Sequence, residues 1–394
     1  MKNYTHTLVA SFIGYITQAI INNFVPLLFL TFQSTYDISL SKITLLVTIN
    51  FGVQLLVDLL AAHYVDKIGY RRAIIAAHIF AAAGLAGLGF LPELFSDPYV
   101  GILLAIGLYA VGGGIIEVLI SPIVEACPTS KKAAAMSLLH SFYCWGHMLV
   151  IIVSTLFFVT FGIGSWRILA VIWAIIPLLN ALYFTQVPIN TLHEEGKSFS
   201  IKELFSMKLF WIFIVLMVCA GASEQAMSQW ASAFAEMGLQ VSKTVGDLAG
   251  PCFFAATMGI ARVLYSRFSE RIALQHVLLG SSLLCISSYL LAVFSPYALL
   301  SLIGCGLCGL SVGIMWPGTF SLASEKCPRG GTAMFAFFAL AGDLGCSAGP
   351  TTVGLVSSAM GGSIKAGLLI AIVFPVMLII GLLACQRVTK QYKQ

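Results

Sequence analysis

The chain has 394 residues, of which 59% are hydrophobic and only 9% are charged. A soluble domain carries about 25% charged residues, so this composition excludes a soluble globular protein and indicates an integral membrane protein. The formal net charge of +5 follows from where basic residues lie relative to the membrane, so it does not indicate nucleic-acid binding.

Apolar stretches long enough to cross a bilayer recur along the whole sequence. A helix rises 1.5 Å per residue, so about 20 apolar residues cross a hydrocarbon core of about 30 Å. Twelve such helices are expected, at residues 5–33, 43–65, 73–92, 98–122, 133–161, 166–187, 207–236, 244–266, 272–294, 297–322, 331–359 and 363–386. The predicted fold class is all-α integral membrane.

The basic residues predict the orientation of these helices. Of the 21 lysines and arginines, all but Lys42, Arg167, Lys243 and Lys365 fall on one side of the predicted membrane. Because basic residues gather on the cytoplasmic side, both termini are expected in the cytoplasm of a multi-pass protein of the plasma (inner) membrane. The first span is too long for a cleavable signal and lacks a small-residue cleavage site.

The longest polar interruption falls near the midpoint and divides the chain. We predict an N-terminal six-helix bundle at residues 1–186, a cytoplasmic linker at 187–206 and a C-terminal six-helix bundle at 207–394. The second half also repeats the first at an offset of about 200 residues, since Gly113, Glu125, Cys127 and Pro128 recur as Gly313, Glu325, Cys327 and Pro328. Two equivalent, pseudo-symmetric bundles that rock around a midplane cavity are a basic design of transporters.

Three acidic residues are predicted to lie near the middle of the membrane: Glu117, Glu224 and Asp343. An aspartate there costs about 2.5–3.5 kcal/mol on insertion scales, so such groups are expected to face a cavity or a partner. A carboxyl group that gains and loses a proton would suit proton coupling, with His140 as a further relay. The alternative is a protonated carboxyl that bonds a neighbouring helix.

Uncharged polar and aromatic residues share these predicted helices. Amides both donate to and accept from hydroxyl groups, and aromatic rings stack on the C–H face of a sugar, so together they suit a neutral polyhydroxylated ligand. The candidate substrate-binding residues are Gln18, Asn22, Asn23, Tyr143, Trp145, His147, Gln225, Ser228, Gln229, Trp230 and Trp316. Each can also serve only to join helices or to pack between them.

Most of the ten cysteines lie inside predicted helices and are expected to be small buried hydrophobic residues. Cys305-x-x-Cys308 has no second pair and no nearby histidine, so neither a metal nor a cofactor is expected. No Gly-x-x-x-x-Gly-Lys-Ser/Thr loop occurs, which argues against transport driven by ATP.

The loop after the second predicted helix reads Asp66-Lys-Ile-Gly69-Tyr-Arg71-Arg72. It resembles the signature loop of the major facilitator superfamily, Gly-x-x-x-Asp-Arg-x-Gly-Arg-Arg, in position, spacing and topology. The resemblance implies the major facilitator fold, a monomer, and a cytoplasmic gate that contacts within this cluster hold closed. The candidate gating residues are Asp66, Gly69, Arg71, Arg72, Glu125, Arg267, Arg271 and Glu325, with Glu125 and Glu325 expected to pair with Arg71/Arg72 and Arg271.

A second motif is similar to the fucose:proton symporter branch of that superfamily. The fourth predicted helix reads Gly112-Gly-Gly114-Ile-Ile-Glu117-Val-Leu-Ile-Ser-Pro122-Ile-Val124, and the first carries Asn22-Asn23. In that branch an aspartate lies three residues after the first asparagine. Val25 stands there in this chain, so the partner acid that the resemblance implies for Glu117 is missing from the first helix.

The pattern favours a secondary active transporter that imports a small neutral solute, such as a sugar, together with protons. One alternative is proton-driven efflux of cationic or amphipathic compounds, because three midplane acids would also bind a cation. An alternative of another class is a non-transporting membrane sensor, although no soluble output domain is evident. An enzyme is not expected, since neither a nucleophile–base arrangement nor a metal site is recognisable. The expected partners are the solute, protons and the lipid bilayer.

Overall fold

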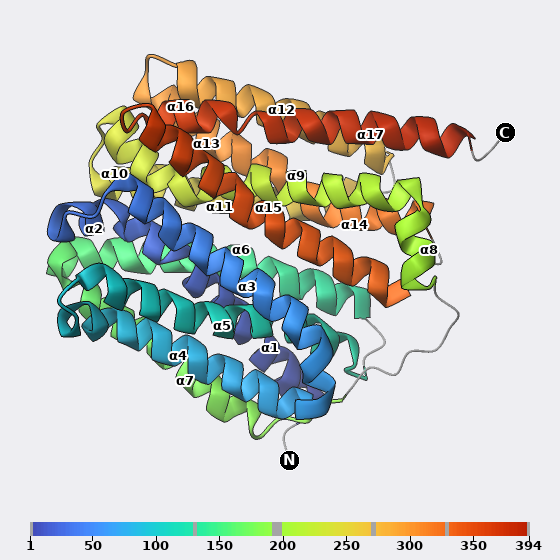
Figure 1. The fold of residues 1–394 in the computed structure, drawn as a ribbon, viewed down its shortest axis with the longest axis horizontal. Helices are drawn as coiled ribbons and strands as arrows, with labels where there is room; N and C mark the ends of the chain where they lie inside the picture. Colours follow the sequence, from blue (N-terminus) through green and yellow to red (C-terminus); the bar gives the residue numbers. More distant parts are fainter. Residues whose placement is uncertain (1–2, 129–131, 191–198, 269–272, 328–330, 392–394) are drawn as a thin grey trace. The chain divides into compact units, whose positions relative to one another are not determined.

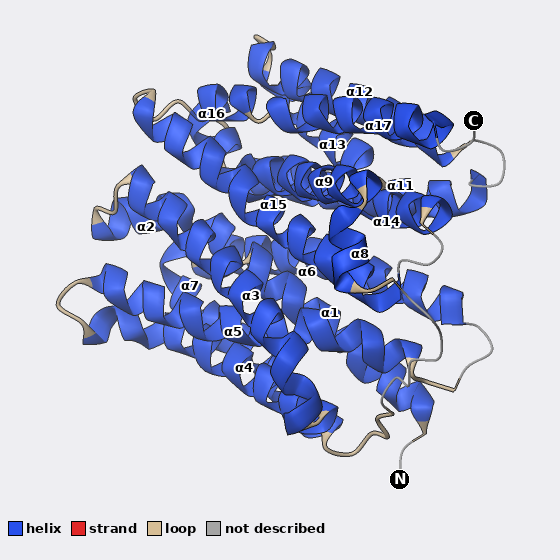
Figure 2. Ribbon diagram, turned by 45° about the vertical axis from the view of Figure 1, so that its right-hand side comes forward, coloured by secondary structure: helices blue, strands red, loops and turns tan. Residues whose placement is uncertain are grey.

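A computed structural model of the chain describes residues 3–128, 132–190, 199–268, 273–327 and 331–391, and every regular element in these ranges is helical (Figure 2). Helices suit the apolar sequence because a backbone in lipid must satisfy its own hydrogen bonds. Arg271 and residues 191–198 of the predicted linker lie outside the described residues, as do the side chains of Asp66 and Arg267.

The first compact unit comprises Met1–Glu194. Its helices are α1 (Tyr4–Asn23), α2 (Phe29–Tyr36), α3 (Leu40–Ile68), α4 (Tyr70–Leu94), α5 (Pro98–Glu125), α6 (Lys132–Phe161) and α7 (Trp166–Phe184), with short 3₁₀ turns at Val25–Leu28 and Ile163–Ser165 (Figure 1). Within this unit α5 packs against α1, α3 and α4. Side chains of α1 and α3 that point towards α5 can therefore meet on its surface.

The second compact unit comprises Glu195–Gln394. Its elements are α8 (Ile201–Ser206), α9 (Lys208–Ala233), a π-helical turn (Phe234–Gly238), α10 (Lys243–Asp247), a second π-helical turn (Leu248–Cys252), α11 (Phe253–Phe268), α12 (Leu274–Phe294), α13 (Ala298–Val312), α14 (Met315–Lys326), α15 (Gly331–Ala359), α16 (Ile364–Ile370) and α17 (Val373–Gln391). Here α9 packs along α15 and α17.

Small residues bring the helices of each unit close together. In the first unit a Cβ on Gly112 of α5 would lie 2.4 Å from the Ala77 carbonyl oxygen of α4. In the second unit a Cβ on Gly345 of α15 would lie 2.1 Å from the Val218 carbonyl oxygen of α9. Neither position has room for a side chain, and such close backbone contact is a common basis of helix packing in membranes.

Two helices are interrupted next to polar residues. α1 ends at Asn23, and the chain continues through a 3₁₀ turn that contains Pro26. Proline has no backbone N–H, so one hydrogen-bond donor is missing there. In the second unit α13 ends at Val312 and α14 begins at Met315, with Gly313 in the break. Interrupted helices expose backbone groups inside a membrane protein, and in transporters they mark binding regions.

Eleven stretches of the described residues are long and apolar enough to cross a membrane, and they correspond to eleven of the twelve expected spans. The other expected span, 331–359, forms the 29-residue helix α15 but is not among the eleven. Asp343, Pro350 and several glycines and serines lower its hydropathy. α15 is therefore long enough to span, although it does not qualify by its hydropathy.

Candidate functional site

Four buried amide side chains form a hydrogen-bonded network between α1 and α3. On α3, the Gln54 Nε2 donates to Asn22 Oδ1 over 2.9 Å and to Asn50 Oδ1 over 3.0 Å. The Asn50 Nδ2 donates to the same Asn22 oxygen over 3.1 Å. One turn away on α1, the Gln18 Nε2 donates to Gln54 Oε1 over 2.8 Å. All four side chains are at most 5% exposed, so the network is held inside the unit.

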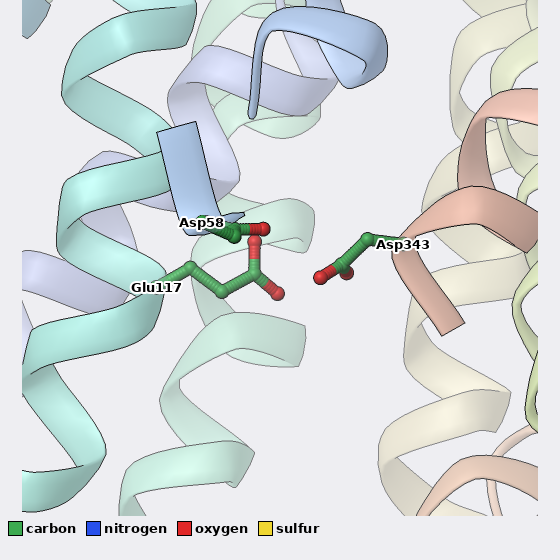
Figure 3. Close-up of side chains that lie close together, drawn as sticks. All are labelled: Asp58, Glu117 and Asp343. Carbon is green, nitrogen blue, oxygen red and sulfur yellow. The ribbon is translucent and has the colours of Figure 1, made fainter. Parts of the chain in front are cut away.

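This network ends at a pair of acids. The Gln18 Nε2 donates its other hydrogen to Glu117 Oε2 on α5 over 3.1 Å. A carboxyl oxygen of Asp58, one turn beyond Gln54 on α3, lies within 4.8 Å of a Glu117 oxygen, and the two groups point towards one another (Figure 3). Two negative charges so close inside a membrane repel strongly, and a proton on either group removes the repulsion.

Gly113 of α5 provides the space for these amides. A Cβ at this position would lie 3.1 Å from Gln18 Oε1 and 3.1 Å from Gln54 Cδ, so alanine would crowd both side chains. The Gln18 Oε1 is buried and has no hydrogen-bond partner among the described residues. A buried acceptor without a donor costs about 1–3 kcal/mol, which is unusual in a network that is otherwise well bonded.

Two predicted residues of α6, Tyr143 and His147, lie on one face of the helix, and Trp145 does not. The Asn23 Nδ2 donates to the Tyr143 hydroxyl over 3.5 Å, and the His147 ring centroid lies 6.5 Å from that of Tyr143. His147 is buried, whereas Trp145 is 49% exposed and sits on another face of α6. Side chains two residues apart on a helix point about 200° apart, so Trp145 does not share the face of Tyr143 and His147, and its role in binding stays a prediction.

His140 lies further along α6, over a different part of α1. Its ring centroid is 5.5 Å from that of Tyr15, whose hydroxyl lies 3.0 Å from Ser121 Oγ on α5. The His140 side chain is exposed in this structure. Its role as a proton relay stays a prediction.

In the second unit the predicted polar residues form a line along α9. The Gln229 Nε2 donates to Gln225 Oε1 over 3.1 Å, and the Gln225 Nε2 donates to Glu224 Oε1 over 3.2 Å. Ser228 is buried beside them, and its hydroxyl has no partner among the described residues. Amides and a carboxyl group are thus joined in both units.

The predicted Trp230 is part of the packing between helices. It is fully buried, and its Nε1 donates to the Pro350 carbonyl oxygen of α15 over 2.9 Å. This bond satisfies a carbonyl of α15 and fixes the indole ring between α9 and α15. The contacts of Trp230 are those of a packing residue, and they do not favour its predicted role in substrate binding.

Arg262 lies on α11 within an apolar span and compensates Glu224. The positive charge of its guanidinium group attracts the Glu224 carboxyl group. Its Nε also donates to the Gly313 carbonyl oxygen over 3.2 Å, in the break between α13 and α14. Arg262 therefore joins a buried acid to a backbone group that the interrupted helix leaves without its usual partner.

Asp343 and Trp316 are neighbours in the second unit. Asp343 is a buried residue of α15. The Trp316 ring of α14 covers the adjacent Gly342, where a Cβ would lie 2.1 Å from a ring carbon. Trp316 therefore packs on α15 at the residue that precedes Asp343, and the roles of both residues in binding and coupling stay predictions.

The predicted gating residues have mixed outcomes. Gly69 joins α3 to α4 with a φ of +87°, which confirms the tight turn that glycine permits there. Arg71 donates to the carbonyl oxygens of Phe184, Thr185 and Val187, at 2.7, 3.1 and 2.8 Å. Arg71 therefore caps the end of α7, and its pairing with Glu125 stays a prediction.

The other gating residues can be placed only in part. Glu325 pairs with its neighbour Lys326 at 2.6 Å, while Arg271, its expected partner, lies outside the described residues. The side chain of Arg72 is exposed, and that of Glu125 is half-buried at the end of α5. The gating role of all these residues stays a prediction.

The sequence analysis missed four polar residues of the site. Asn50, Gln54 and Asp58 follow one another at intervals of four in the otherwise apolar α3, so they share a face. That spacing was a usable signal. Arg262 was assigned to the cytoplasmic side with the other basic residues, and only its hydrogen bond to Gly313 and its attraction to Glu224 place it in the site.

Comparisons with known proteins agree with this architecture. A family model described as the Major Facilitator Superfamily matches residues 7–350. A search of curated protein sequences found no significant match. Among solved structures, a bacterial homologue of the human lysosomal transporter Spinster, in an inward-facing and occupied conformation, is 15% identical with a TM-score of 0.75, over 98% of each chain.

Two sugar symporters are also similar in structure. The fucose:proton symporter of E. coli is 18% identical with a TM-score of 0.67, over 98% of this chain and 99% of that chain. A D-xylose-proton symporter is 16% identical with a TM-score of 0.72, over 96% of this chain and 95% of that chain. At these identities the likeness concerns the fold alone.

Proposed function

The chain belongs to the Major Facilitator Superfamily and is a membrane transporter, and from this premise we propose that it carries a small neutral solute, such as a sugar, together with protons. Transport proceeds by alternating access of a site near the middle of the membrane. The protein lies in the plasma membrane as a monomer with both termini in the cytoplasm.

The observation that carries the proposal is the hydrogen bond between Gln18 and Glu117. It joins a set of uncharged amides, suited to hydroxyl groups, directly to a group that can hold a proton. A symporter requires that binding of the solute and binding of the proton influence each other. A direct contact between the two kinds of group is the simplest way to achieve this.

The proton site is Glu117 with Asp58 as its partner. The missing acid of the first helix is replaced, in this proposal, by an acid of α3 that faces Glu117 from a different direction. Glu224 also remains a candidate for a proton, and the charge of Arg262 attracts its carboxyl group. Asp343 remains a candidate for a second proton.

The solute-binding groups of the first unit are Asn22 and Asn23 of α1 and Tyr143 of α6, and those of the second unit are Gln225, Ser228 and Gln229 of α9. These groups are uncharged and both donate and accept hydrogen bonds. His147 lies beside Tyr143 and supplies a further polar contact. The sugar symporters of similar fold support a sugar as the first class to test.

Efflux of a cationic compound is the second candidate function, and the Asp58–Glu117 pair is the observation that favours it. Two carboxylates would attract an organic cation as readily as a proton. The amides beside them argue for a neutral solute, because they offer a cation no additional charge.

The test is uptake of radiolabelled L-fucose, D-xylose and D-glucose into proteoliposomes, with and without an inward proton gradient. The proposal predicts that at least one sugar accumulates faster with the gradient. A cationic dye is measured in the same vesicles. Dye movement against its gradient, with no sugar uptake, would replace symport by efflux.

A further inference from the structure

We propose that Gln18 and Gln54 form an amide relay, in which protonation of Glu117 reverses the direction of the hydrogen bonds as far as Asn22 and Asn50. This inference rests on the proposed function, because it takes Glu117 as the group that binds the proton. It assigns to two buried glutamines the task of coupling the proton to the solute.

The relay begins with the present direction of the bonds. Both hydrogens of the Gln18 amide are used, one towards Glu117 Oε2 and one towards Gln54 Oε1. The Gln54 amide in turn donates to Asn22 and Asn50. Every bond therefore points one way along the network, and a carboxylate at its end accepts from Gln18.

Protonation of Glu117 conflicts with this arrangement at its first bond. The conflict arises when the proton is on Oε2, the oxygen that accepts from Gln18, because this O–H and the Gln18 Nε2 then both donate. Half a turn of the Gln18 amide places Oε1 opposite Glu117 and restores a bond. The Gln18 Oε1 has no partner among the described residues in the present arrangement, so the turn breaks no bond made by that atom.

The reversal then passes along the side chain–side chain bonds of the network, at the expense of the bond from Gln54 Nε2 to the Asn50 backbone carbonyl oxygen and with the Gln18 Nε2 moved to the position where Oε1 had no partner. The turned Gln18 Oε1 faces Gln54 Oε1, so Gln54 must turn and donate its Nε2 to Gln18. The Gln54 Oε1 then faces Asn22 and Asn50, which each turn and donate through Nδ2. Each side chain–side chain bond is remade in the opposite direction, and no oxygen accepts more than two hydrogens.

The space for this rotation is provided by Gly113. A Cβ there would lie 3.1 Å from Gln18 Oε1 and 3.1 Å from Gln54 Oε1, which are the atoms that must move. Gly107, on the same helix, has nothing within 4 Å of a built Cβ. Alanine at 113 therefore hinders the relay without removing any hydrogen-bonding group, and alanine at 107 is its matched control.

The consequence is a change in what Asn22 offers to a solute. When its amide turns, the position that held an N–H donor holds a C=O acceptor, and a hydroxyl group must bind in the opposite sense. The affinity for the solute then depends on the proton, and by linkage the affinity for the proton depends on the solute.

The test is infrared difference spectroscopy of the purified protein in liposomes between acidic and alkaline pH, with no solute present. Glutamine is labelled with ¹³C at its side-chain carbonyl, which separates its band from the backbone. We expect the carbonyl band of a protonated carboxyl group and the glutamine band to change with the same midpoint. Both changes vanish in Glu117→Gln, while Gln275→Leu, an amide outside the network, retains both.

Two variants separate the relay from the proton site. In Gln18→Leu and in Gly113→Ala the carboxyl band still titrates, and the glutamine change is lost, whereas Gly107→Ala behaves like the wild type. A glutamine change that persists in Gln18→Leu and Gly113→Ala overturns the relay. A wild-type spectrum in which the carboxyl band changes with pH and the glutamine band does not would also overturn the relay, even if Gln18→Leu does not fold.

Asp58 is a titratable group of this unit that faces Glu117, so the variant Asp58→Asn is measured as well. The relay predicts that the glutamine change survives in Asp58→Asn with a shifted midpoint. If it survives in Glu117→Gln and is lost in Asp58→Asn, Asp58 drives the network and the relay from Glu117 is wrong. If no carboxyl band depends on Glu117 at all, both the relay and the proposed proton site fail.

Discussion

The amide nitrogen of Gln18 lies 3.1 Å from a carboxyl oxygen of Glu117. These residues belong to α1 and α5, which are far apart in the sequence and adjacent in the first unit. Their contact brings a proton-binding group and an uncharged polar group together inside an apolar protein. Such a pair is costly to bury, so it is expected to serve a function.

Asn180 is expected to stabilise the first unit. Its Nδ2 donates to the Ala10 carbonyl oxygen over 3.0 Å and lies 2.8 Å from the Nε2 of the buried His78. Asn180→Ala leaves both groups without this partner, and a loss of about 1–3 kcal/mol is expected. Thermal unfolding in detergent measures it, with the exposed Asn190→Ala as control. Equal melting temperatures for the two variants would contradict this role.

Arg262 and Glu224 are expected to depend on each other. Arg262→Gln leaves the buried Glu224 carboxyl group without its compensating charge, so it should destabilise the second unit. The same change in a Glu224→Gln background should cost less, with a coupling energy of about 0.5–3 kcal/mol. Unfolding of the four proteins in the double-mutant cycle measures this energy. Additive effects would show that the two charges do not interact.

The orientation in the membrane can be tested with single cysteines. All ten native cysteines are buried, so an impermeant maleimide should label them slowly. Ser96, between α4 and α5, and Ser206, at the end of α8, are both exposed. In intact cells Ser96→Cys should react and Ser206→Cys should react only after permeabilisation. The reverse pattern would place the termini outside the cell.

The sequence predicted the helices well because lipid leaves the backbone few alternatives. The repeat of Gly113 as Gly313 pointed to equivalent segments, yet α5 is continuous at Gly113 while α13 ends next to Gly313. A repeat in sequence therefore did not predict a repeat in local geometry. In the second unit, Arg262 donates to the carbonyl oxygen of Gly313 in this break.

The site was predicted less completely than the fold. Glu117, Gln18 and Asn22 were recognised because charged and amide groups stand out in apolar helices. Their partners on α3 were missed because the sequence alone does not say which face of α3 meets α1 and α5. Trp145 was placed in the site on its residue type, although its position on α6 turns it away from Tyr143 and His147.

The central claim is that Glu117 couples a proton to the movement of a neutral solute. The most direct test compares wild type, Glu117→Gln and the control Glu203→Gln, an acid of α8 outside the membrane spans, in proteoliposomes with the sugar that the wild type accumulates. We predict that Glu117→Gln loses gradient-driven accumulation but retains exchange of labelled for unlabelled sugar, while Glu203→Gln retains both. Full gradient-driven accumulation by Glu117→Gln would contradict the account.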